Sequence, residues 1–231
     1  MLMGIRSGMG SQATIDLYQK IVNQTPARED QEHIHVIIDS YPQIPDRTQA
    51  LLYDGEDPLP YLLDSLKRLE LIGVTHVILP CNTAHAYIPQ LQEQSVVTFI
   101  NMQHETANYI KRHYPLVKTV GLLATTGTVK IGLYQDACSQ VGLKVICPNQ
   151  DDQETFVMRA IYGQKGIKAG YLDQNNKDLL YKAAVSLIQQ GAELIIGGCT
   201  EIPLVINKDD LDVPFVDPTD IVAQHIVSIV R

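Results

Sequence analysis

Two of the four cysteines stand at matching points of a sequence that repeats itself. Cys81 follows the apolar run "HVILP", and Cys199 follows the apolar run "LIIGG". A cysteine reacts as its thiolate, which a helix N-terminus stabilises. Two such thiols on opposite faces of one carbon atom could remove a proton from one side and return a proton from the other. That chemistry would invert the configuration of the carbon.

Three segments of the first half of the chain recur in the same order in the second half. "MGIRSGMGSQATIDLYQK" resembles "VGLLATTGTVKIGLYQDA", "LELIGVTHVILPCNTA" resembles "LIQQGAELIIGGCTEI", and "VTFINMQHETANYI" resembles "VPFVDPTDIVAQHI". Cys81 pairs with Cys199 at an offset of 118 residues, and Phe99 pairs with Phe215 at an offset of 116. We therefore interpret residues 1–115 and 116–231 as two α/β domains of common origin, with a last helix that could pack on the first domain.

Each half alternates predicted strands and helices. The strands are expected at 2–5, 35–38, 76–79 and 98–100, and then at 119–123, 143–147, 194–196 and 214–216. The helices are expected at 12–24, 57–72, 84–93 and 103–113, and then at 127–140, 151–162, 174–190 and 218–230. Short runs of Val, Ile and Leu are typical of strands covered by helices on both faces. The pattern predicts two pseudosymmetric α/β domains, each with a mainly parallel sheet flanked by helices.

The placement of the two cysteines predicts where the active site lies. Ligands of open parallel sheets bind beyond the carboxyl ends of the strands. Both thiols follow a strand, and each is expected at a helix N-terminus, where backbone N–H groups would stabilise a thiolate. We expect the two thiols to face each other across a cleft between the domains, with one small molecule between them.

Composition narrows the class of partner. The 231 residues carry a net charge of -8 without a basic cluster, which argues against a nucleic-acid partner. The apolar runs are far shorter than the roughly 20 residues that span a membrane. Four cysteines in such a chain are typical of free thiols in the cytoplasm. An anionic substrate would need local cations, because the overall field would not attract it.

A glycine pattern near the start raises the possibility of an oxidoreductase. Gly8, Gly10 and Ala13 form G-x-G-x-x-A, which also occurs in dinucleotide sites. Such a site needs an acidic residue about 20 positions further on. Asp39 lies 29 residues after Gly10, and the repeat keeps the turn as "TTGT" without the glycine pattern. We therefore interpret the loop as a strand-to-helix turn that presents N–H groups to a small anion.

Several motifs together resemble the aspartate/glutamate racemase family, and most closely its aspartate racemase branch. They are "GMG" at 8–10, "PDRT" at 45–48, "CNTAH" at 81–85, "GLLATTGT" at 121–128 and "GCTE" at 198–201. The resemblance covers nearly the whole chain. It implies a cofactor-independent isomerase, without pyridoxal phosphate or a metal, that interconverts L- and D-aspartate. It also implies catalysis by Cys81 and Cys199 as a thiol and thiolate pair, and a homodimer.

One cation from each half is expected to hold the distal carboxylate of the substrate. Arg47 lies in a proline-rich loop after the second strand, and a guanidinium can bind a carboxylate through two hydrogen bonds. The repeat offset leads from Arg47 to the neighbourhood of Lys165 and Lys168. The resemblance favours Lys168 in "IKAG".

Small polar residues near both thiols could cap helices, bind the substrate, or do both. Those expected to line the substrate are Met9, Gly10, Asn82, Thr83, Thr125, Thr126 and Thr200. His85 would share a helix face with Cys81, where it could tune the thiol or bond a neighbouring loop. Glu201 would raise the pKa of Cys199, which suits an acid. Cys138 and Cys147 are interpreted as buried structural residues.

Arg6 departs both from the family pattern and from the internal repeat, which place an apolar residue there; its repeat partner is Leu123. A buried charge is costly unless it is paired. Arg6 could reach a carboxylate in the cleft, pair elsewhere, or indicate a different substrate. Racemisation of glutamate, isomerisation of a related dicarboxylate, and dicarboxylate binding without catalysis remain alternatives, because one methylene group changes binding by only ~1–3 kcal/mol.

Overall fold

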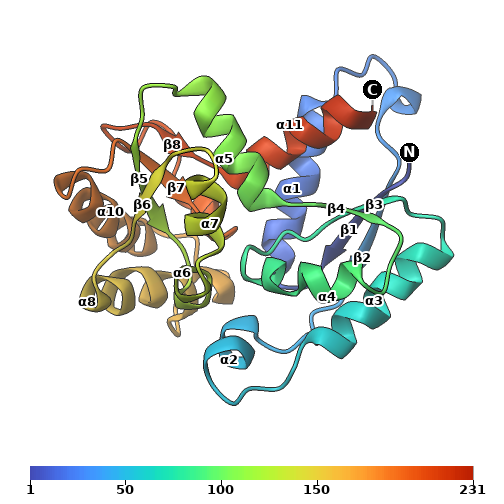
Figure 1. The fold of residues 1–231 in the computed structure, drawn as a ribbon, viewed down its shortest axis with the longest axis horizontal. Helices are drawn as coiled ribbons and strands as arrows, with labels where there is room; N and C mark the ends of the chain where they lie inside the picture. Colours follow the sequence, from blue (N-terminus) through green and yellow to red (C-terminus); the bar gives the residue numbers. More distant parts are fainter. Residues whose placement is uncertain (231) are drawn as a thin grey trace. The chain divides into compact units, whose positions relative to one another are not determined.

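The computed structural model describes residues 1–230, which form two compact units (Figure 1). Unit 1 contains Met1–Met102 and the segment from Thr219 onward, and unit 2 contains Gln103–Pro218. Each unit has a four-stranded sheet whose strands are all parallel. Helices flank both sheets, so the predicted fold class is confirmed.

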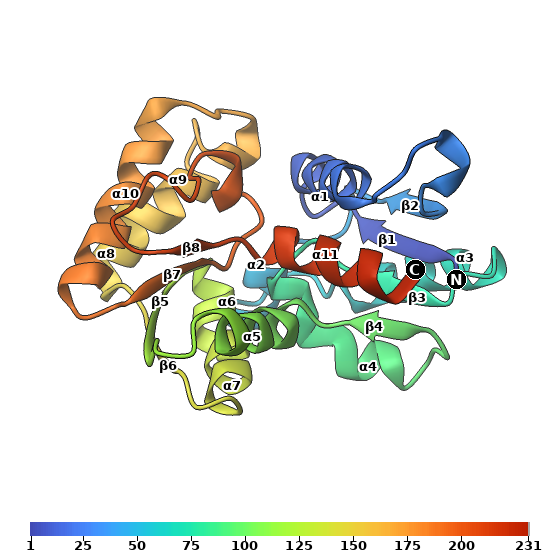
Figure 2. The same cartoon turned by 90° about the horizontal axis from the view of Figure 1, so that it is seen from above.

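The sheet of unit 1 has the strand order β2-β1-β3-β4. Its strands are β1 (Met3–Ser7), β2 (Val36–Ser40), β3 (His76–Ile78) and β4 (Thr98–Ile100). The helices are α1 (Ser11–Gln24), α2 (Arg47–Leu52), α3 (Leu59–Leu71), α4 (Ile88–Gln92) and α11 (Pro218–Val230), with 3₁₀ turns at Asp30–Glu32 and Thr83–Tyr87. Buried residues of α1 and α11 pack on one face, and buried residues of α3 and α4 pack on the other (Figure 2).

Alternation along β1 sends its side chains to opposite faces of this sheet. Met3 and Ile5 belong to the core beneath α1 and α11. Gly4 faces α3 instead, because a Cβ atom added there would lie 3.4 Å from Leu69 Cδ1 of α3 and 2.7 Å from Val74 Cγ1 in the loop after it. Arg6 is two residues further along the strand and therefore shares the face of Gly4. On β3, Val77 belongs to this same α3-side core.

The sheet of unit 2 repeats the arrangement with the order β6-β5-β7-β8. Its strands are β5 (Thr119–Leu123), β6 (Lys144–Ile146), β7 (Leu194–Gly197) and β8 (Phe215–Val216). The helices are α5 (Met102–His113), α6 (Thr126–Ile131), α7 (Leu133–Ser139), α8 (Gln150–Asp152), α9 (Arg159–Tyr162) and α10 (Gln174–Gln189), with 3₁₀ turns at Ile167–Ala169 and Ile202–Leu204. The α9 and α10 helices contribute to the core that also holds Leu123 of β5 and Ile195 of β7.

Three sequence-based expectations about helices are wrong. The helix expected at 127–140 is broken into α6 and α7, because Gly132 adopts a left-handed conformation with φ of 81°. The helix expected at 151–162 is interrupted by a π-helical segment, Gln153–Met158. Arg47 lies not in a loop but at the first position of α2, where the Asp46 side chain accepts a hydrogen bond from the backbone of Gln49.

The compact units differ from the two halves of the sequence repeat by one helix each. Most of α5 is grouped with unit 2, and most of α11 with unit 1. Three residues of α11, Val222, Ala223 and Ile226, are fully buried in the core that contains Met3 and Ile5. Unit 1 is therefore completed by a segment that follows unit 2 in the sequence. Among residues 1–230, no helix is both long and apolar enough to cross a membrane.

Candidate active site

Cys81 lies at the carboxyl end of β3 in unit 1. Its side chain is 6% exposed and belongs to the α3-side core with Leu79 and Met9. The chain turns directly into a 3₁₀ turn and then into α4, and Ala84 N donates to Cys81 O at 3.2 Å. Asn82 precedes this turn, but its side chain makes no capping hydrogen bond, so the capping interpretation is wrong for this residue. Asn82 and Thr83, which directly follow Cys81 in the sequence, are both buried.

His85 contacts the backbone of Cys81. Met102 N donates to His85 Nε2 at 3.2 Å, so Nε2 is an acceptor and carries no proton. The ring proton therefore sits on Nδ1, which lies 3.0 Å from Cys81 O and donates to it. These bonds describe a neutral imidazole that fixes the turn after β3.

Arg47 is held against the loop that follows β1. Its Nη2 donates to Met9 O at 3.2 Å, and its Nη1 donates to Pro45 O at 3.0 Å. The side chain is buried, and carbonyl oxygens fix the guanidinium in place. Gly10 is the N-cap residue of α1 and accepts a hydrogen bond from Thr14 Oγ1. Met9, Gly10 and Arg47 are thus brought together at one edge of unit 1.

Cys199 lies two residues beyond β7 in unit 2, in a cluster of charged groups. Its Sγ donates to Glu201 Oε2 at 2.9 Å, and Lys168 Nζ lies 2.6 Å from Glu201 Oε1. Thr200 Oγ1 also donates to Glu201 Oε2, at 3.3 Å. The expected helix after Cys199 is only the 3₁₀ turn Ile202–Leu204, so little helix dipole acts on this thiol.

The surroundings of Cys199 favour its protonated form. Burial raises the pKa of Cys199 well above its usual value, and the Glu201 carboxylate raises it further. Burial alone would also raise the pKa of Glu201, but the Lys168 ammonium and the thiol hydrogen bond outweigh it, so that pKa is lowered. The cluster is therefore a thiol, a carboxylate and an ammonium at neutral pH.

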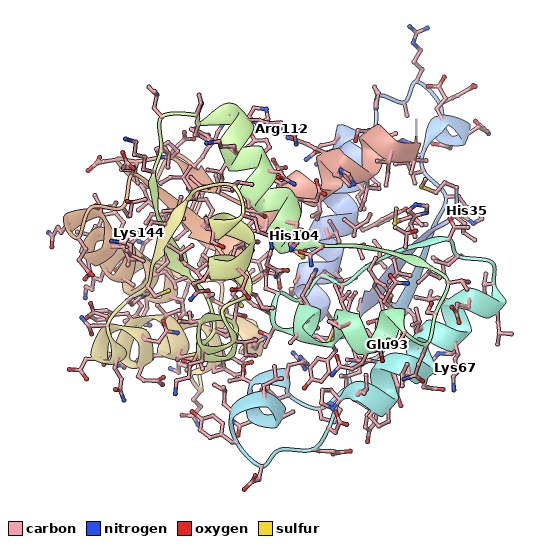
Figure 3. All side chains as sticks on the ribbon, viewed as in Figure 1. His35, Lys67, Glu93, His104, Arg112 and Lys144 are labelled. Carbon is pink, nitrogen blue, oxygen red and sulfur yellow. The ribbon has the colours of Figure 1, made fainter. Side chains whose placement is uncertain are left out.

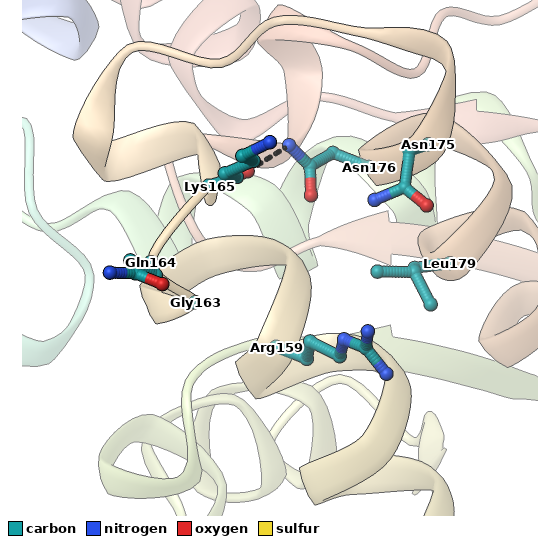
Figure 4. A pocket seen from close by; sticks show the side chains of 7 residues that line it. All are labelled: Arg159, Gly163, Gln164, Lys165, Asn175, Asn176 and Leu179. Carbon is teal, nitrogen blue, oxygen red and sulfur yellow. Dashed lines mark hydrogen bonds between the residues drawn. The ribbon is translucent and has the colours of Figure 1, made fainter.

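Lys165 and Lys168 lie in different surroundings in the structure. Lys168 joins the Cys199 cluster through Glu201 and also lies 5.5 Å from the centre of the Tyr162 ring. Lys165 lines a different pocket of about 280 Å³ (Figure 4). The residues lining that pocket are Arg159, Gly163, Gln164, Lys165, Asn175, Asn176 and Leu179, and none of them belongs to the Cys199 cluster.

The two threonines after β5 have structural partners. Thr125 caps α6, since Thr128 N donates to Thr125 Oγ1 at 3.3 Å. Thr126 Oγ1 donates to Glu154 Oε1 at 3.0 Å, and Gln153 Nε2 donates to the carbonyl of Ala124 at 2.9 Å. Glu154 comes from the π-helical segment, and sequence reasoning did not select it because the contact spans 28 residues.

Of the remaining cysteines, Cys138 has the environment of a buried structural residue, whereas Cys147 is only half-buried, so the prediction that it is buried is wrong. Cys138 is fully buried, and burial raises its pKa to about 12. Burial also raises the pKa of Cys147 to about 11. All four cysteines are free thiols, as the sequence predicts.

Most charged side chains lie on the surface, which sets the buried ones apart. Figure 3 labels six exposed examples, His35, Lys67, Glu93, His104, Arg112 and Lys144. By contrast, Arg6, Arg47 and Glu201 are all buried. No group of three His, Cys, Asp or Glu side chains that could hold a metal ion occurs among the described residues.

A family model described as Asp/Glu/Hydantoin racemase matches residues 7–226. A broad specificity amino-acid racemase of Bacillus subtilis is 27% identical to the chain over 233 residues, covering 98% of this chain and 97% of that protein.

Solved structures show the same fold. The aspartate racemase of Picrophilus torridus is 26% identical, with a TM-score of 0.83 over 99% of this chain and 93% of that chain. The glutamate racemase of Francisella tularensis, solved in complex with D-glutamate, is 17% identical, with a TM-score of 0.69 over 99% of this chain and 80% of that chain. This second likeness concerns the fold alone.

Proposed function

Because the chain belongs to the Asp/Glu/hydantoin racemase family, we propose that it interconverts L- and D-aspartate without a cofactor. The observation that carries the proposal is the pair of buried cysteines at equivalent strand ends of the two repeats, Cys81 after β3 and Cys199 after β7. Sequence identity of 26% to an aspartate racemase supports aspartate as the substrate.

The proposed reaction needs one thiolate and one thiol. The thiolate takes the α-proton, the C–H bond breaks, and its electron pair stays on the α-carbon, delocalised into the carboxylate. The thiol then gives its proton to the other face of that carbon, which forms the opposite enantiomer. The two cysteines have exchanged protonation states, so the reverse reaction uses them in the opposite roles.

The Cys199 cluster supports an acid role for this residue in the resting protein. Its thiol is buried and donates to Glu201, so the proton is retained at neutral pH. Cys81 then serves as the base. Glu201 would be a positioning residue that holds the thiol of Cys199 protonated.

Two buried or half-buried cations support a substrate with a second carboxylate. Arg47 and Lys168 are proposed to bind it, Arg47 from α2 and Lys168 from the turn Ile167–Ala169. The residues proposed to contact the rest of the substrate are Met9, Gly10, Asn82, Thr83, Thr125, Thr126 and Thr200. His85 is proposed to act through the backbone of Cys81.

The broad specificity of the Bacillus subtilis relative favours a wider test than aspartate alone. Glutamate is the nearest alternative, since one methylene group separates the substrates by only ~1–3 kcal/mol. A dicarboxylate-binding protein without catalysis is a further alternative. The presence of both cysteines argues against it, because binding alone would not require two thiols.

The test is proton NMR in D₂O with purified reduced protein and no added cofactor, run beside chiral chromatography on aspartate, glutamate and a panel of neutral and basic amino acids. We expect α-deuterium and D-aspartate from L-aspartate. Cys81→Ser and Cys199→Ser should abolish inversion, whereas Cys138→Ser should retain most of it. Inversion that survives both catalytic substitutions would disprove the two-thiol mechanism. Binding of aspartate without exchange by the native protein would favour the non-catalytic alternative.

We also propose that the protein works as a homodimer in a reducing compartment such as the cytoplasm. Family membership supports the first proposal, and the four free cysteines support the second. Light scattering coupled to size-exclusion chromatography measures the mass directly, and a 25.7 kDa species would contradict the dimer.

A further inference from the structure

Arg6 lies inside unit 1 on the same side of the sheet as Cys81. It is 0% exposed and follows Gly4 and Ile5 on β1, and it faces α3. β3 is the parallel neighbour of β1, with Ile5 paired to Ile78. Leu79 and Cys81 continue from β3 into the core on this α3 side. A guanidinium and a thiol are thus directed into one buried region.

The guanidinium lacks the partners that a buried cation normally has. Arg6 Nε and Nη2 have no hydrogen-bond partner among residues 1–230, and Nη1 contacts only a weak acceptor, Met9 Sδ, at 3.5 Å. Asp39 is the register neighbour of Arg6 on β2, but its Oδ2 accepts hydrogen bonds from Ser65 and Arg68. A buried charge without an anion is strongly unfavourable, so such a group requires an explanation.

The electrostatics identify the thiol as the anion that suits this cation. Burial lowers the pKa of Arg6 to about 9, so the side chain remains charged at neutral pH. Among the groups that would counteract this lowering, a thiolate at Cys81 ranks ahead of the Asp39 carboxylate. Because Arg6 has no exposed surface, it would act on the thiol rather than on a bound substrate.

The second repeat provides an internal comparison. Leu123 replaces Arg6 at the equivalent position of β5 and shares a core with Cys199. Glu201, which binds Cys199, is replaced in the first repeat by Thr83. The two thiols therefore have neighbours of opposite charge, a cation near Cys81 and a carboxylate at Cys199.

We propose that Arg6 is a positioning residue that holds Cys81 as the thiolate in the resting protein, so that Cys81 is the base and Cys199 the acid before substrate binds. This inference deepens the proposed racemase function and assigns the resting roles of its two thiols. It also explains why an arginine replaces the apolar residue that the repeat predicts.

The other charged or titratable groups near Cys81 are less suited than Arg6 to stabilise a thiolate there. Asp39 on β2 is negative, and Arg68 on α3 is paired with it at 2.9 Å. Arg47 on α2 is a second cation, but it is bound to the carbonyl of Met9. Two further groups follow Cys81 itself. His85 is neutral, and burial raises the pKa of Tyr87 to about 12, which keeps its phenol protonated.

The test is the pH dependence of Cys81 alkylation by iodoacetamide, resolved by peptide mass spectrometry, without substrate. Arg6→Leu is the main variant, since Leu123 occupies the equivalent position in the second repeat. We expect the midpoint of Cys81 alkylation to rise by about one pH unit or more, which is a ~10-fold loss of thiolate at neutral pH. Arg6→Lys should restore part of the shift.

Two controls make the result specific. Arg159→Leu removes the same charge from the surface of unit 2 and should leave the Cys81 profile unchanged. Urea titration of Arg6→Leu followed by circular dichroism should show a cooperative transition like that of the native protein, which shows that the fold is retained. If Arg6→Leu does not fold, Arg6→Met carries the same test.

Each outcome decides the proposal. A Cys81 profile in folded Arg6→Leu that coincides with the native profile would overturn it, and so would an equal shift in Arg159→Leu. Because no substrate is present, a shifted profile in a protein that racemises no amino acid would refute the proposed function and leave this inference standing. An unshifted Cys81 profile in Arg6→Leu, together with racemase activity of the native protein, would refute this inference and leave the proposed function standing.

Discussion

At the scale of single residues, the two cysteines Cys81 and Cys199 lie in different electrostatic environments. Cys199 donates to Glu201 at 2.9 Å, whereas Cys81 shares a core with the α3-facing side of β1, where Arg6 is buried. A carboxylate disfavours a thiolate and a guanidinium favours one. An acid and a base can therefore come from two copies of one residue without any difference between the cysteines themselves.

Glu201→Gln should lower the pKa of the Cys199 thiol. Glu201 raises the pKa of Cys199, so a neutral amide should lower the alkylation midpoint of Cys199 by about one pH unit. Burial remains and should keep the midpoint above that of a free cysteine. Glu193→Gln is the matched control, because Glu193 accepts bonds from Lys118 N and Thr119 N at the surface of unit 2. An unchanged Cys199 profile in Glu201→Gln would contradict the assigned role.

Arg6→Leu should stabilise the protein at neutral pH. Burial lowers the pKa of Arg6 to about 9, so folding disfavours its cation, and this penalty is fully present below pH 9. The penalty fades as the pH rises above about 9. Urea titrations should show a gain of roughly 1–4 kcal/mol at pH 7 and a smaller gain at pH 10. A loss of stability at pH 7 would show that the attraction between Arg6 and the Cys81 thiolate outweighs the burial penalty of the guanidinium.

Much of the site could be predicted from residues because the chain repeats. The repeat selected Cys81 and Cys199 over Cys138 and Cys147, and it marked Arg6 as a departure. The contact between Lys168 and Glu201 spans 33 residues, so no local pattern encodes it. The hydrogen bond from Met102 to His85, which fixes the ring proton, is likewise set only when separate elements pack.

At the scale of elements, strands were easier to predict than helices. The strands β4 and β5 have the expected bounds, and each begins at a threonine that leads into large apolar residues. The expected helix at 127–140 fails at Gly132, whose left-handed conformation costs little only for glycine. The π-helical segment Gln153–Met158 depends on packing that apolar spacing does not reveal.

The loop between β1 and α1 requires Gly8 for two reasons. Gly8 has a φ of 101°, and a Cβ atom there would lie 2.3 Å from the backbone of Tyr41. Gly142 has a similar φ of 79° but no heavy atom within 4 Å of its added Cβ. Gly8→Ala should therefore lose ~1–3 kcal/mol more than Gly142→Ala, since overpacking adds to the backbone strain that both share. Urea denaturation measures the free energy of unfolding of both variants. Equal losses of stability would show that the loop can move away from Tyr41.

At the scale of the whole molecule, the sequence repeat and the folded units divide the chain differently. The repeat divides it near residue 115, whereas unit 1 recruits the segment from Thr219 onward. Two of the fully buried side chains of α11, Val222 and Ile226, stabilise the sheet by ~1.5–3 kcal/mol each. Their sum is comparable with the entire stability of a small domain.

A fragment of residues 1–115 should therefore fail to fold. It contains every strand of unit 1 but leaves Met3, Ile5 and Ile78 without their α11 neighbours. Urea titration followed by circular dichroism should show no cooperative transition. Residues 1–102 joined by a flexible linker to residues 219–230 should restore one. A cooperative transition in the shorter fragment would show that the repeat, and not the compact unit, is the folding domain.

The position of α11 in the sequence, after unit 2, also determines the order in which the two units can finish folding during synthesis. Unit 2 is continuous in sequence, so all of its residues emerge before the helix that completes unit 1. At synthesis rates of about 5–20 residues per second, the stretch between Met102 and Thr219 takes on the order of ten seconds to translate. During that interval the nascent sheet of unit 1 carries an uncovered apolar face. The amino-terminal part of this protein is thus the last to finish folding, since its apolar face stays uncovered until α11 has been synthesised.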